Sequence, residues 1–573
     1  MNYFFLLLSL AFPLLSYAAA PDDINSNQRA WFDAVDINAD NDYTNNPGNN
    51  AAIALWNDKS GSGNHISQTI ATSQPRYLLD NISTGRHGVK LDGIDDELID
   101  ANDIWLGSVS SAESFLVATT DKFQTSSLFA STDNHTNRLS VHLPWGSVNT
   151  FFDQGICCGT PARLYGNIPI SLQQPYVWYF AGLPNLQGVF QDGKIRLSDA
   201  GAGTYTVTAN SSFNLGGWPV LVSGHIHAGR YFEAIFYQTA LNNAQRSILH
   251  SYLSAKWDKT LDASPTYSDV YAGDNAANGD YDFFVGGIGQ DNGLQKIATS
   301  QGLTITDTSF LTNDGKFILA GVDYLGTAPP IGTTVADVPM GYSQRSNRSW
   351  YIDRTGNDGL VNLSFDAAEL GIPISNGSNY GLLHRSNVTG IFSEVAVAVM
   401  ANGAIDFSYL PDDGVYVIGI KGKVALSLDK VSQTVRDPIN LTLNPKSIPG
   451  SNTDYTLTIK NTGDGIPDTD TTIIRDNIPS ELTLFTGDLD GNGSPFVFTD
   501  SQCPPTSNPL NSNLTLDYPA KVLFRDATGN ELIPSMAYDS AVRSFEITMS
   551  GSMNASLGGM VPCFSIRYRT RLD

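Results

Sequence analysis

The clearest pattern in the chain is a short apolar run followed by apolar residues at helical spacing. Phe232–Tyr237 is apolar and aromatic, which predicts a buried strand. Asn242 and Asn243 are favourable N-cap residues and predict the start of a helix. One face of that helix is apolar and consists of Leu241, Ile248, Leu249, Tyr252 and Leu253. Three polar residues lie off this face: Arg246, His250 and Lys256.

Elsewhere, short runs with alternating apolar and polar residues predict strands. Ser114–Thr120, Arg138–Trp145 and Tyr176–Gly182 are such runs in the first half of the chain. An Asp-Gly pair at Asp192 between two alternating runs predicts a β-hairpin. In the last part, Tyr455, Leu457 and Ile459 fall on one side of a predicted strand. We therefore predict an all-β protein with a single substantial helix.

Length and charge narrow the possible functions. A chain of 573 residues is too long for one core and predicts about three or four domains. The net charge of −24 argues against partners such as nucleic acid or an anionic membrane surface. The acidic residues are eight Glu and 49 Asp (57 minus 8). Asp favours turns and binds calcium, so this composition suits an Asp-turned β protein; plain solubility with many turns is the alternative.

The N-terminus carries a targeting segment. Phe4–Leu15 is apolar but too short to span a membrane as an ordinary helix. Small residues at Ser16 and Ala18 predict cleavage after Ala18, so residues 1–18 are a predicted signal peptide. No positive side chain precedes the apolar run, which leaves an uncleaved anchor as the alternative. We expect a secreted or cell-surface protein with no integral membrane segment after cleavage.

The four cysteines agree with export to an oxidising compartment. Cys503 and Cys563 lie in the same C-terminal region and predict a disulfide. Cys157 and Cys158 are adjacent, and either a vicinal disulfide or two free buried thiols fits them. The spacing of the four fits no zinc site.

Motifs at fixed spacing mark the first part of the chain. The first motif comprises Trp56, Asp58, Ser60, Gly61, Gly63 and Asn64, and the second comprises Asp92, Gly93, Asp95 and Asp96. The closing strand and helix contribute Glu233, Tyr237, Tyr252, Leu253, Lys256 and Trp257. Together they resemble bacterial LamG-like domains, which have the concanavalin A-like fold. The resemblance implies a jelly-roll sandwich with one C-terminal helix over residues 19–258.

Two further units follow the first. Residues 266–422 contain Val285–Asp291, Phe310–Phe317 and Trp350–Gly356, which resemble a β-rich domain of unknown function that follows LamG-like domains in secreted bacterial proteins. Residues 424–573 resemble the conserved-repeat domain of bacterial cell-surface proteins, an Ig-like β-sandwich. The matching residues are Pro449, Gly450, Tyr455, Asn461, Gly463, Asp476, Ile478 and Pro479.

One loop places oxygen-bearing side chains at every second position: Asp36, Asn38, Asp40 and Asp42. Calcium takes six to eight oxygen ligands, and alternate positions in a turn supply several to one ion. The loop is therefore a candidate calcium site, with calcium as the predicted cofactor. A solvated Asp- and Asn-rich loop is the alternative interpretation.

Catalytic constellations are missing from the sequence. Glycan hydrolases on this fold carry two carboxylates on one strand, whereas Glu233 has no acidic neighbour. His225 and His227 look superficially like part of a lyase site, but they are too close in sequence to the matching strand, and we predict structural histidines. Most of the eight Trp are expected in cores, although exposed aromatics also stack on sugars. No catalytic residue is predicted, and the ligand-binding residues stay unassigned.

These inferences predict an exported, non-catalytic surface or adhesion protein. Its LamG-like head would bind a glycan or a surface or matrix protein, with calcium assisting. Two alternatives stay open. One is a carbohydrate-active enzyme, a hydrolase or lyase on the jelly roll. The other is a purely structural surface or pilus-associated component.

Overall fold

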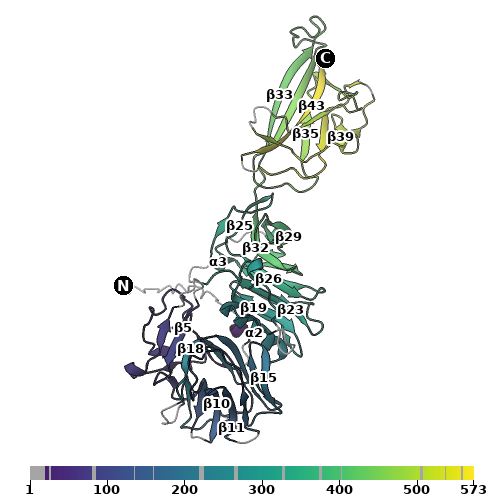
Figure 1. Cartoon of the computed structure of the whole chain (residues 1–573). Helices are drawn as coiled ribbons and strands as arrows, with labels where there is room; N and C mark the ends of the chain where they lie inside the picture. The colour runs from purple at the N-terminus through teal and green to yellow at the C-terminus, as the bar shows by residue number, and fades with distance from the viewer. Residues whose placement is uncertain are drawn as a thin grey trace, which may run out of the picture.

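The computed structural model places the chain in three β domains (Figure 1). The described residues are 20–24, 27–79, 86–133, 136–158, 161–218, 225–262, 269–325, 330–372, 377–401, 403–503, 508–535, 537–556 and 559–573. The predicted signal peptide, residues 1–18, lies outside them. Within the described part, no helix is long and apolar enough to cross a membrane.

The first domain is a sandwich of two antiparallel sheets. Its strands are β1 (Gln28–Asp33), β2 (Leu55–Trp56), β3 (Ile66–Ser67), β4 (Arg76–Leu78), β5 (Gly88–Asp92), β6 (Leu98–Asp100), β7 (Ser108–Val109), β8 (Ala112–Ala118), β9 (Phe129–Thr132), β10 (Asn137–Trp145), β11 (Asn149–Ile156), β12 (Arg163–Asn167), β13 (Tyr176–Leu183), β14 (Leu186–Gln191), β15 (Lys194–Asp199), β16 (Tyr205–Thr206), β17 (Ser212–Leu215) and β18 (Ala228–Tyr237), with a short 3₁₀ helix η1 (Ala71–Ser73). One sheet has the order β15-β14-β13-β8-β18-β5-β4, and β1 also pairs with β18. The other has the order β12-β11-β10-β9-β17-β6-β3-β2, while β16 pairs with β7.

The core of the first domain lies between these two sheets, because alternate residues of neighbouring strands point inward. The three strands expected in this region form as β8, β10 and β13. The expected hairpin also forms, between β14 and β15. Its two-residue turn places Asp192 and Gly193 at positive φ, as a type I′ turn requires. The inward-facing residues include Leu116, Phe129, Phe152, Phe180 and Phe236.

The predicted helix forms as α2 (Asn243–Trp257) and packs on the outer face of the β13-β8-β18 sheet. Asn242 is its N-cap and forms a capping box with Gln245. The apolar face is buried as expected, but the opposite face is buried too, because the second domain covers it. Arg246, His250 and Lys256 are therefore interior residues rather than solvent-facing ones.

The second domain is a further sandwich of a nine-stranded and a five-stranded sheet. Its elements are β19 (Phe283–Gln290), β20 (Leu294–Gln295), β21 (Ile297–Ser300), β22 (Leu303–Asp307), β23 (Lys316–Val322), β24 (Thr333–Thr334), β25 (Tyr342–Ser346), β26 (Trp350–Thr355), β27 (Val361–Asp366), β28 (Tyr380–Arg385), β29 (Ser393–Val397), β30 (Met400–Ala401), β31 (Ala404–Tyr409), β32 (Gly414–Lys421), α3 (Ala367–Leu370), η2 (Ala276–Asn278) and η3 (Gly377–Asn379). The short N-terminal helix α1 (Ala20–Asp23) also docks here, since both Asp23 oxygens accept hydrogen bonds from Thr299.

The third domain is a smaller sandwich of seven-stranded and four-stranded sheets. Its strands are β33 (Leu426–Arg436), β34 (Asn452–Asn461), β35 (Ile473–Asn477), β36 (Leu482–Phe485), β37 (Val497–Asp500), β38 (Pro509–Leu510), β39 (Val522–Arg525), β40 (Glu531–Leu532), β41 (Tyr538–Asp539), β42 (Ser544–Thr548) and β43 (Val561–Leu572). Leu457 and Ile459 point into its core, as the alternation predicts. The Cys503–Cys563 disulfide forms in this domain, and Cys157–Cys158 forms a vicinal disulfide in the first.

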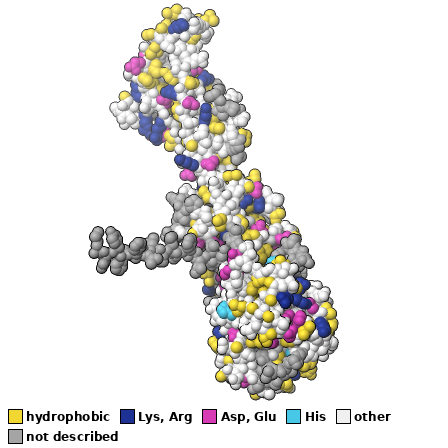
Figure 2. Space-filling view, turned by 90° about the vertical axis from the view of Figure 1, so that its left-hand side faces the viewer, with side chains coloured by type: hydrophobic (Ala, Val, Ile, Leu, Met, Phe, Trp, Pro, Cys, Tyr) yellow, Lys and Arg dark blue, Asp and Glu magenta, His cyan; other side chains and the backbone are white. Residues whose placement is uncertain are grey.

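The predicted all-β class, with a jelly-roll sandwich, one helix at its end and two further sandwiches, is confirmed. The first two domains share one hydrophobic cluster, whereas the third has a cluster of its own and forms a separate lobe (Figure 1). Figure 2 shows acidic, basic and hydrophobic side chains interspersed over the visible face of the molecule.

Candidate functional site

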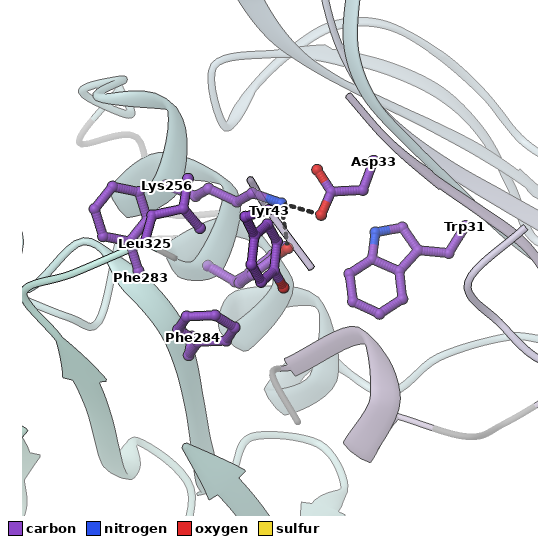
Figure 3. Close-up of a pocket in the computed structure, with 8 residues that line it drawn as sticks. Trp31, Asp33, Tyr43, Lys256, Phe283, Phe284 and Leu325 are labelled. Carbon is purple, nitrogen blue, oxygen red and sulfur yellow. Dashed lines mark hydrogen bonds and ion pairs between the residues drawn. The ribbon is translucent and has the colours of Figure 1, made fainter. Parts of the chain in front are cut away.

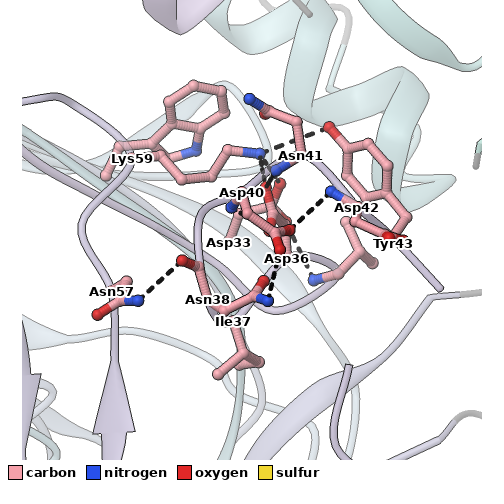
Figure 4. Close-up of polar contacts among 12 residues, drawn as sticks. Asp33, Asp36, Ile37, Asn38, Asp40, Asn41, Asp42, Tyr43, Asn57 and Lys59 are labelled. Carbon is pink, nitrogen blue, oxygen red and sulfur yellow. Dashed lines mark hydrogen bonds and ion pairs between the residues drawn. The ribbon is translucent and has the colours of Figure 1, made fainter. Parts of the chain in front are cut away.

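The predicted calcium loop is held together by its own side chains (Figure 4). Asp36 accepts hydrogen bonds from the backbone N–H groups of Asp40 and Asn41. The Asp40 carboxylate accepts from the Asn38 side-chain amide at 2.9 Å and from the backbone N–H of Asp42 at 2.8 Å. These bonds form Asx-type turns, in which short polar side chains bind nearby backbone groups. The oxygens proposed for calcium therefore already have partners, and calcium here stays a prediction.

A lysine supplies the positive charge next to this loop. The Lys59 ammonium lies 2.7 Å from Asp36 and 3.3 Å from Asp33, and all three side chains are at most 5% exposed. Figure 4 shows the Lys59 amino group between these carboxylates and the Tyr43 ring, over which it also lies. An ammonium in this position does electrostatically what a bound cation would do.

The charge network continues across the closing strand and helix of the first domain. Lys256 of α2 lies 2.9 Å from Asp33 and 3.0 Å from Glu233. Glu233 is fully buried, and its oxygens accept hydrogen bonds from three further side chains: Trp31 Nε1, Tyr252 OH and Trp257 Nε1. Burial raises the pKa of Glu233, and the Lys256 ammonium opposes that rise. For Asp33, burial acts in the same direction, but Lys256 and Lys59 outweigh it and lower the pKa.

A small cavity at the junction of the first two domains adjoins this network (Figure 3). Phe283, Phe284 and Leu325 of the second domain line it opposite Trp31 and Asp33 of the first. Its volume is about 10 Å³. Such a cavity has room for about one water molecule. The network and the cavity therefore belong to the domain junction and not to a ligand site.

The second sequence motif brings three carboxylates together at the end of β5. Asp92, Asp95 and Asp96 each place an oxygen within 4.8 Å of the others. Among the described residues, no other set of three Asp, Glu, His or Cys side chains meets this condition. Asp92 and Asp96 also accept backbone hydrogen bonds within the same turn. The predicted residues Asp36, Asp40 and Asp42 do not form such a group.

The two histidines that precede β18 have different surroundings. His227 is buried, and its Nε2 donates to the Thr119 carbonyl oxygen at 2.8 Å. Burial lowers the pKa of His227 to about 4, so the ring is neutral at pH 7. His225 instead packs edge-on against Trp145, with ring centres 4.9 Å apart. The structure thus places them in separate environments.

The outer face of the sheet that contains β10, β11 and β12 carries three neighbouring aromatic residues, which we call the aromatic platform: Trp145, Phe151 and Tyr165. Phe151 is paired across strands with Tyr165, and their rings stack with centres 6.0 Å apart. The ring of Trp145 meets Phe151 edge-on at 5.7 Å. Tyr165 is 70% exposed, and the other two are half-buried. Most of the Trp are expected in cores: seven of the eight are buried, and Trp145 is the one that is half-buried.

Polar rows border the platform on both sides. Asn149 pairs across the strands with Trp145 and with Asn167, and both asparagines are exposed. On the other side, the Arg163 guanidinium lies over the Phe151 ring at 4.8 Å. Amide and guanidinium donors therefore flank a row of aromatic rings, an arrangement that offers both stacking and hydrogen bonds to one ligand.

A buried ion-pair cluster stands next to Phe151 on the same face of the sheet and orients Arg163. The fully buried Asp153 accepts two hydrogen bonds from Arg163, at 2.6 and 2.8 Å, and one from Arg138 at 2.5 Å. Arg138 in turn contacts the sulfur of Cys158 at 3.8 Å. Because the Arg163 fork is held at both nitrogens, its remaining Nη1 edge is oriented in advance.

Sequence reasoning missed the platform for a specific reason. It found the alternating pattern of β10 and the Trp145 side chain, but alternation does not say which of two faces is solvated. Phe151 and Tyr165 belong to β11 and β12, and the pairing of these two strands cannot be read from the sequence. The available signal is the aromatic residue at each of the three positions, and residue type does not show that a side chain is exposed.

No protein-family model matches the chain, and no curated protein matches it either. Among solved structures, the chain is similar to domain 4 of an extracellular GH43 arabinanase from Geobacillus stearothermophilus, in complex with arabinotriose. The identity is 18% over 38% of this chain and 96% of that chain, with a TM-score of 0.26.

Two other solved structures show comparable likeness. The ligand-binding domain of botulinum neurotoxin serotype D, in complex with N-acetylneuraminic acid, is 12% identical over 70% of this chain and 98% of that chain, with a TM-score of 0.28. A heptameric SAP-like pentraxin from Limulus polyphemus is 14% identical over 29% of this chain and 82% of that chain, with a TM-score of 0.24. TM-scores this low do not establish a shared fold.

Proposed function

We propose that this chain is an exported, non-catalytic surface protein whose LamG-like first domain binds a glycan on the aromatic platform. The observation that carries the proposal is the row of solvent-facing rings at Trp145, Phe151 and Tyr165, bordered by Asn149, Asn167 and Arg163. Sugar rings have apolar faces and polar edges, so a ring stacks on an aromatic side chain while its hydroxyls bind amides and guanidinium groups.

The platform is suited to an extended ligand. Its rings lie on three adjacent strands, so a bound chain would run across the strands and meet each ring in turn. A contiguous patch of exposed apolar side chains marks a binding surface more often than a single exposed side chain does. The third domain, with its separate core, serves in this proposal as a spacer or docking unit.

The non-catalytic part of the proposal is supported by Glu233. This residue has no exposed surface, and its oxygens are occupied by Trp31, Tyr252, Trp257 and Lys256. A carboxylate in that environment is out of reach of a glycosidic bond, and hydrolysis by a carboxylate pair needs two that are accessible. Calcium remains part of the proposal as an assisting ion.

The test is a glycan array probed with the full mature chain, in calcium and in EDTA, alongside Tyr165→Ala. Phe123→Ala is the matched control, because Phe123 is an exposed aromatic of the same domain that lies off β10, β11 and β12. We expect binding to a defined glycan, weakened about tenfold or more by Tyr165→Ala and unchanged by Phe123→Ala.

The other outcomes separate the alternatives. Binding that survives EDTA removes calcium from the proposal but leaves the platform. Equal binding by native protein and Tyr165→Ala would place the glycan elsewhere. The absence of glycan binding both in calcium and in EDTA would favour a protein ligand or a purely structural role. Release of reducing sugar would favour the enzyme alternative.

A further inference from the structure

A second candidate site lies in the second domain, remote in sequence from the platform. A polar pocket of about 290 Å³ opens there, near the ends of β25 and β28. Two arginines line it, Arg345 and Arg385, with Tyr281, Asn347 and Ser349 as further polar groups. Neither the sequence motifs nor the proposed glycan function uses this pocket.

The two guanidinium groups lie close together around one aromatic ring. Both lie over Phe392, Arg385 at 4.3 Å and Arg345 at 5.2 Å from the ring centre. Phe392 is buried, so it fixes the two groups from below. A planar guanidinium over a ring can still form hydrogen bonds in its own plane. For Arg345, Nε and Nη1 already donate to the Ala336 and Ser346 carbonyl oxygens.

The two arginines share a single carboxylate as their ion-pair partner. Both arginines share one oxygen of Asp337, at 3.3 Å from Arg385 and 3.7 Å from Arg345, and that carboxylate is 45% exposed. The hydrogen bonds of Arg385 both come from Nη1, to Asp337 and to the Gly390 carbonyl oxygen. Its Nε is buried without a partner in the described part of the chain.

The surroundings of Arg345 disfavour its positive charge. Burial lowers the pKa of Arg345, Asp337 partly offsets this, and the Arg385 cation lowers it further. A carboxylate placed between two such groups would form charge-assisted hydrogen bonds, which are about twice as strong as neutral ones.

The other residues that line the pocket determine which further functional groups of a ligand it can bind. The Tyr281 hydroxyl and Ser349 hydroxyl lie 3.2 Å apart, and Asn347 adds an amide. Asp323 also lines the pocket and supplies an acceptor for hydroxyl groups. Ligand pockets in proteins begin at about 300 Å³, so this one holds about one ring.

We propose that this pocket binds a sugar acid, with its carboxylate between Arg345 and Arg385 and its hydroxyls toward Tyr281, Ser349 and Asp323. The site does not depend on the platform, because different residues of a different domain form it. The ligand would be either a free sugar acid or the terminal residue of an acidic glycan, and both present the same carboxylated ring.

Titration calorimetry of the full chain with D-glucuronate, D-glucose and acetate at constant ionic strength tests this proposal. We expect D-glucuronate to bind with a Kd of about 1 mM or tighter, and D-glucose and acetate about tenfold more weakly. Arg385→Gln should weaken D-glucuronate binding about tenfold or more, and the gentler Tyr281→Phe about threefold. Arg354→Gln is the control, because Arg354 is half-buried and pairs with Asp412 outside the pocket.

The outcomes are distinguishable from those of the platform. Binding of D-glucuronate that is unchanged in Tyr165→Ala and lost in Arg385→Gln supports the proposal. Equal binding of acetate and D-glucuronate would overturn it in favour of a general anion site, and retention of binding in both Arg385→Gln and Tyr281→Phe would also overturn it. A uronic-acid-terminated oligosaccharide that binds more tightly than the monosaccharide identifies the glycan as the source, and equal affinities identify the free acid.

Discussion

The two sheets of the first domain have the same alternating construction but opposite surroundings on their outer faces. The face of β13, β8 and β18 carries Tyr179 and Tyr237, which α2 and the second domain cover completely. The face of β10, β11 and β12 carries Phe151 and Tyr165, which remain in contact with solvent. Aromatic residues stand on both faces, so residue type alone does not distinguish core from binding surface.

The partners of buried carboxylates also differ between the two faces. On the covered face, Glu113 is fully buried and accepts hydrogen bonds from Arg246 and from the Tyr179 hydroxyl. On the open face, Asp153 is equally buried, but its partner Arg163 keeps 22% of its side chain exposed. Charges on the covered face are therefore satisfied within the protein, while the open face retains a donor for a ligand.

The largest expected effect concerns the covered face. Glu233→Ala should lower the free energy of unfolding by about 3–5 kcal/mol, because it breaks the buried ion pair with Lys256 and deprives Trp31, Tyr252 and Trp257 of their acceptor. Calorimetry of the full chain measures this loss. Glu481→Ala, at an exposed glutamate of the third domain, is the control and should change it by less than about 0.5 kcal/mol. A loss below about 1 kcal/mol for Glu233→Ala would show that the network contributes little.

Replacement of a tyrosine by alanine on each face compares the stability of the covered face with that of the open face. Tyr237→Ala should cost about 3–5 kcal/mol, because the ring is completely buried. Tyr165→Ala should cost less than about 0.5 kcal/mol, because 70% of the residue is already exposed. Chemical denaturation followed by tryptophan fluorescence measures both. Similar losses in the two variants would mean that the platform is held by packing and is not a free surface.

A pH experiment tests whether Glu97, which lies on the same sheet as the platform but away from it, is shielded from water. Glu97 precedes β6 and accepts a hydrogen bond from Asn214 at 2.5 Å, and burial raises its pKa to about 7. Its folded-state pKa is above the unfolded value, so its contribution is full below about pH 4.5 and is lost as the pH rises through about 7.

Glu97→Gln should therefore remove about 1–2 kcal/mol of the decrease in stability between about pH 5 and pH 8. Melting curves of the native protein and the variant across this range measure the difference. Other carboxyls with raised pKa, such as Asp274, contribute equally to both proteins and cancel. Parallel curves would show that Glu97 is ionised in the folded state.

The smallest expected effect concerns the domain junction. Arg86 lies 2.7 Å from Asp282 of the second domain and donates to the Lys256 carbonyl oxygen at the end of α2. Arg86→Met should lower the free energy of the unfolding transition shared by the first two domains by about 1 kcal/mol. The unfolding transition of the third domain should not change. Arg475→Met, at a pair whose arginine side chain is 69% exposed, is the control. Three separate transitions in the native protein would contradict a shared core.

The sequence by itself determined the local elements. Alternation defined β8, β10 and β13, the Asp-Gly pair defined the turn between β14 and β15, and Asn242 defined the start of α2. These features depend on residues close together in the chain, where φ preference, capping and side-chain periodicity act directly. The all-β class follows from the same local signals.

Tertiary structure decided the environment of each face. Arg246, His250 and Lys256 have the spacing of a solvated helix face, yet they are buried because a second domain packs there. Asp36 has the spacing of a calcium ligand, yet its carboxylate meets Lys59, which lies elsewhere in the sequence. The platform and the pair Arg345 and Arg385 join residues of different strands, so their assembly depends on register and on which surfaces remain uncovered.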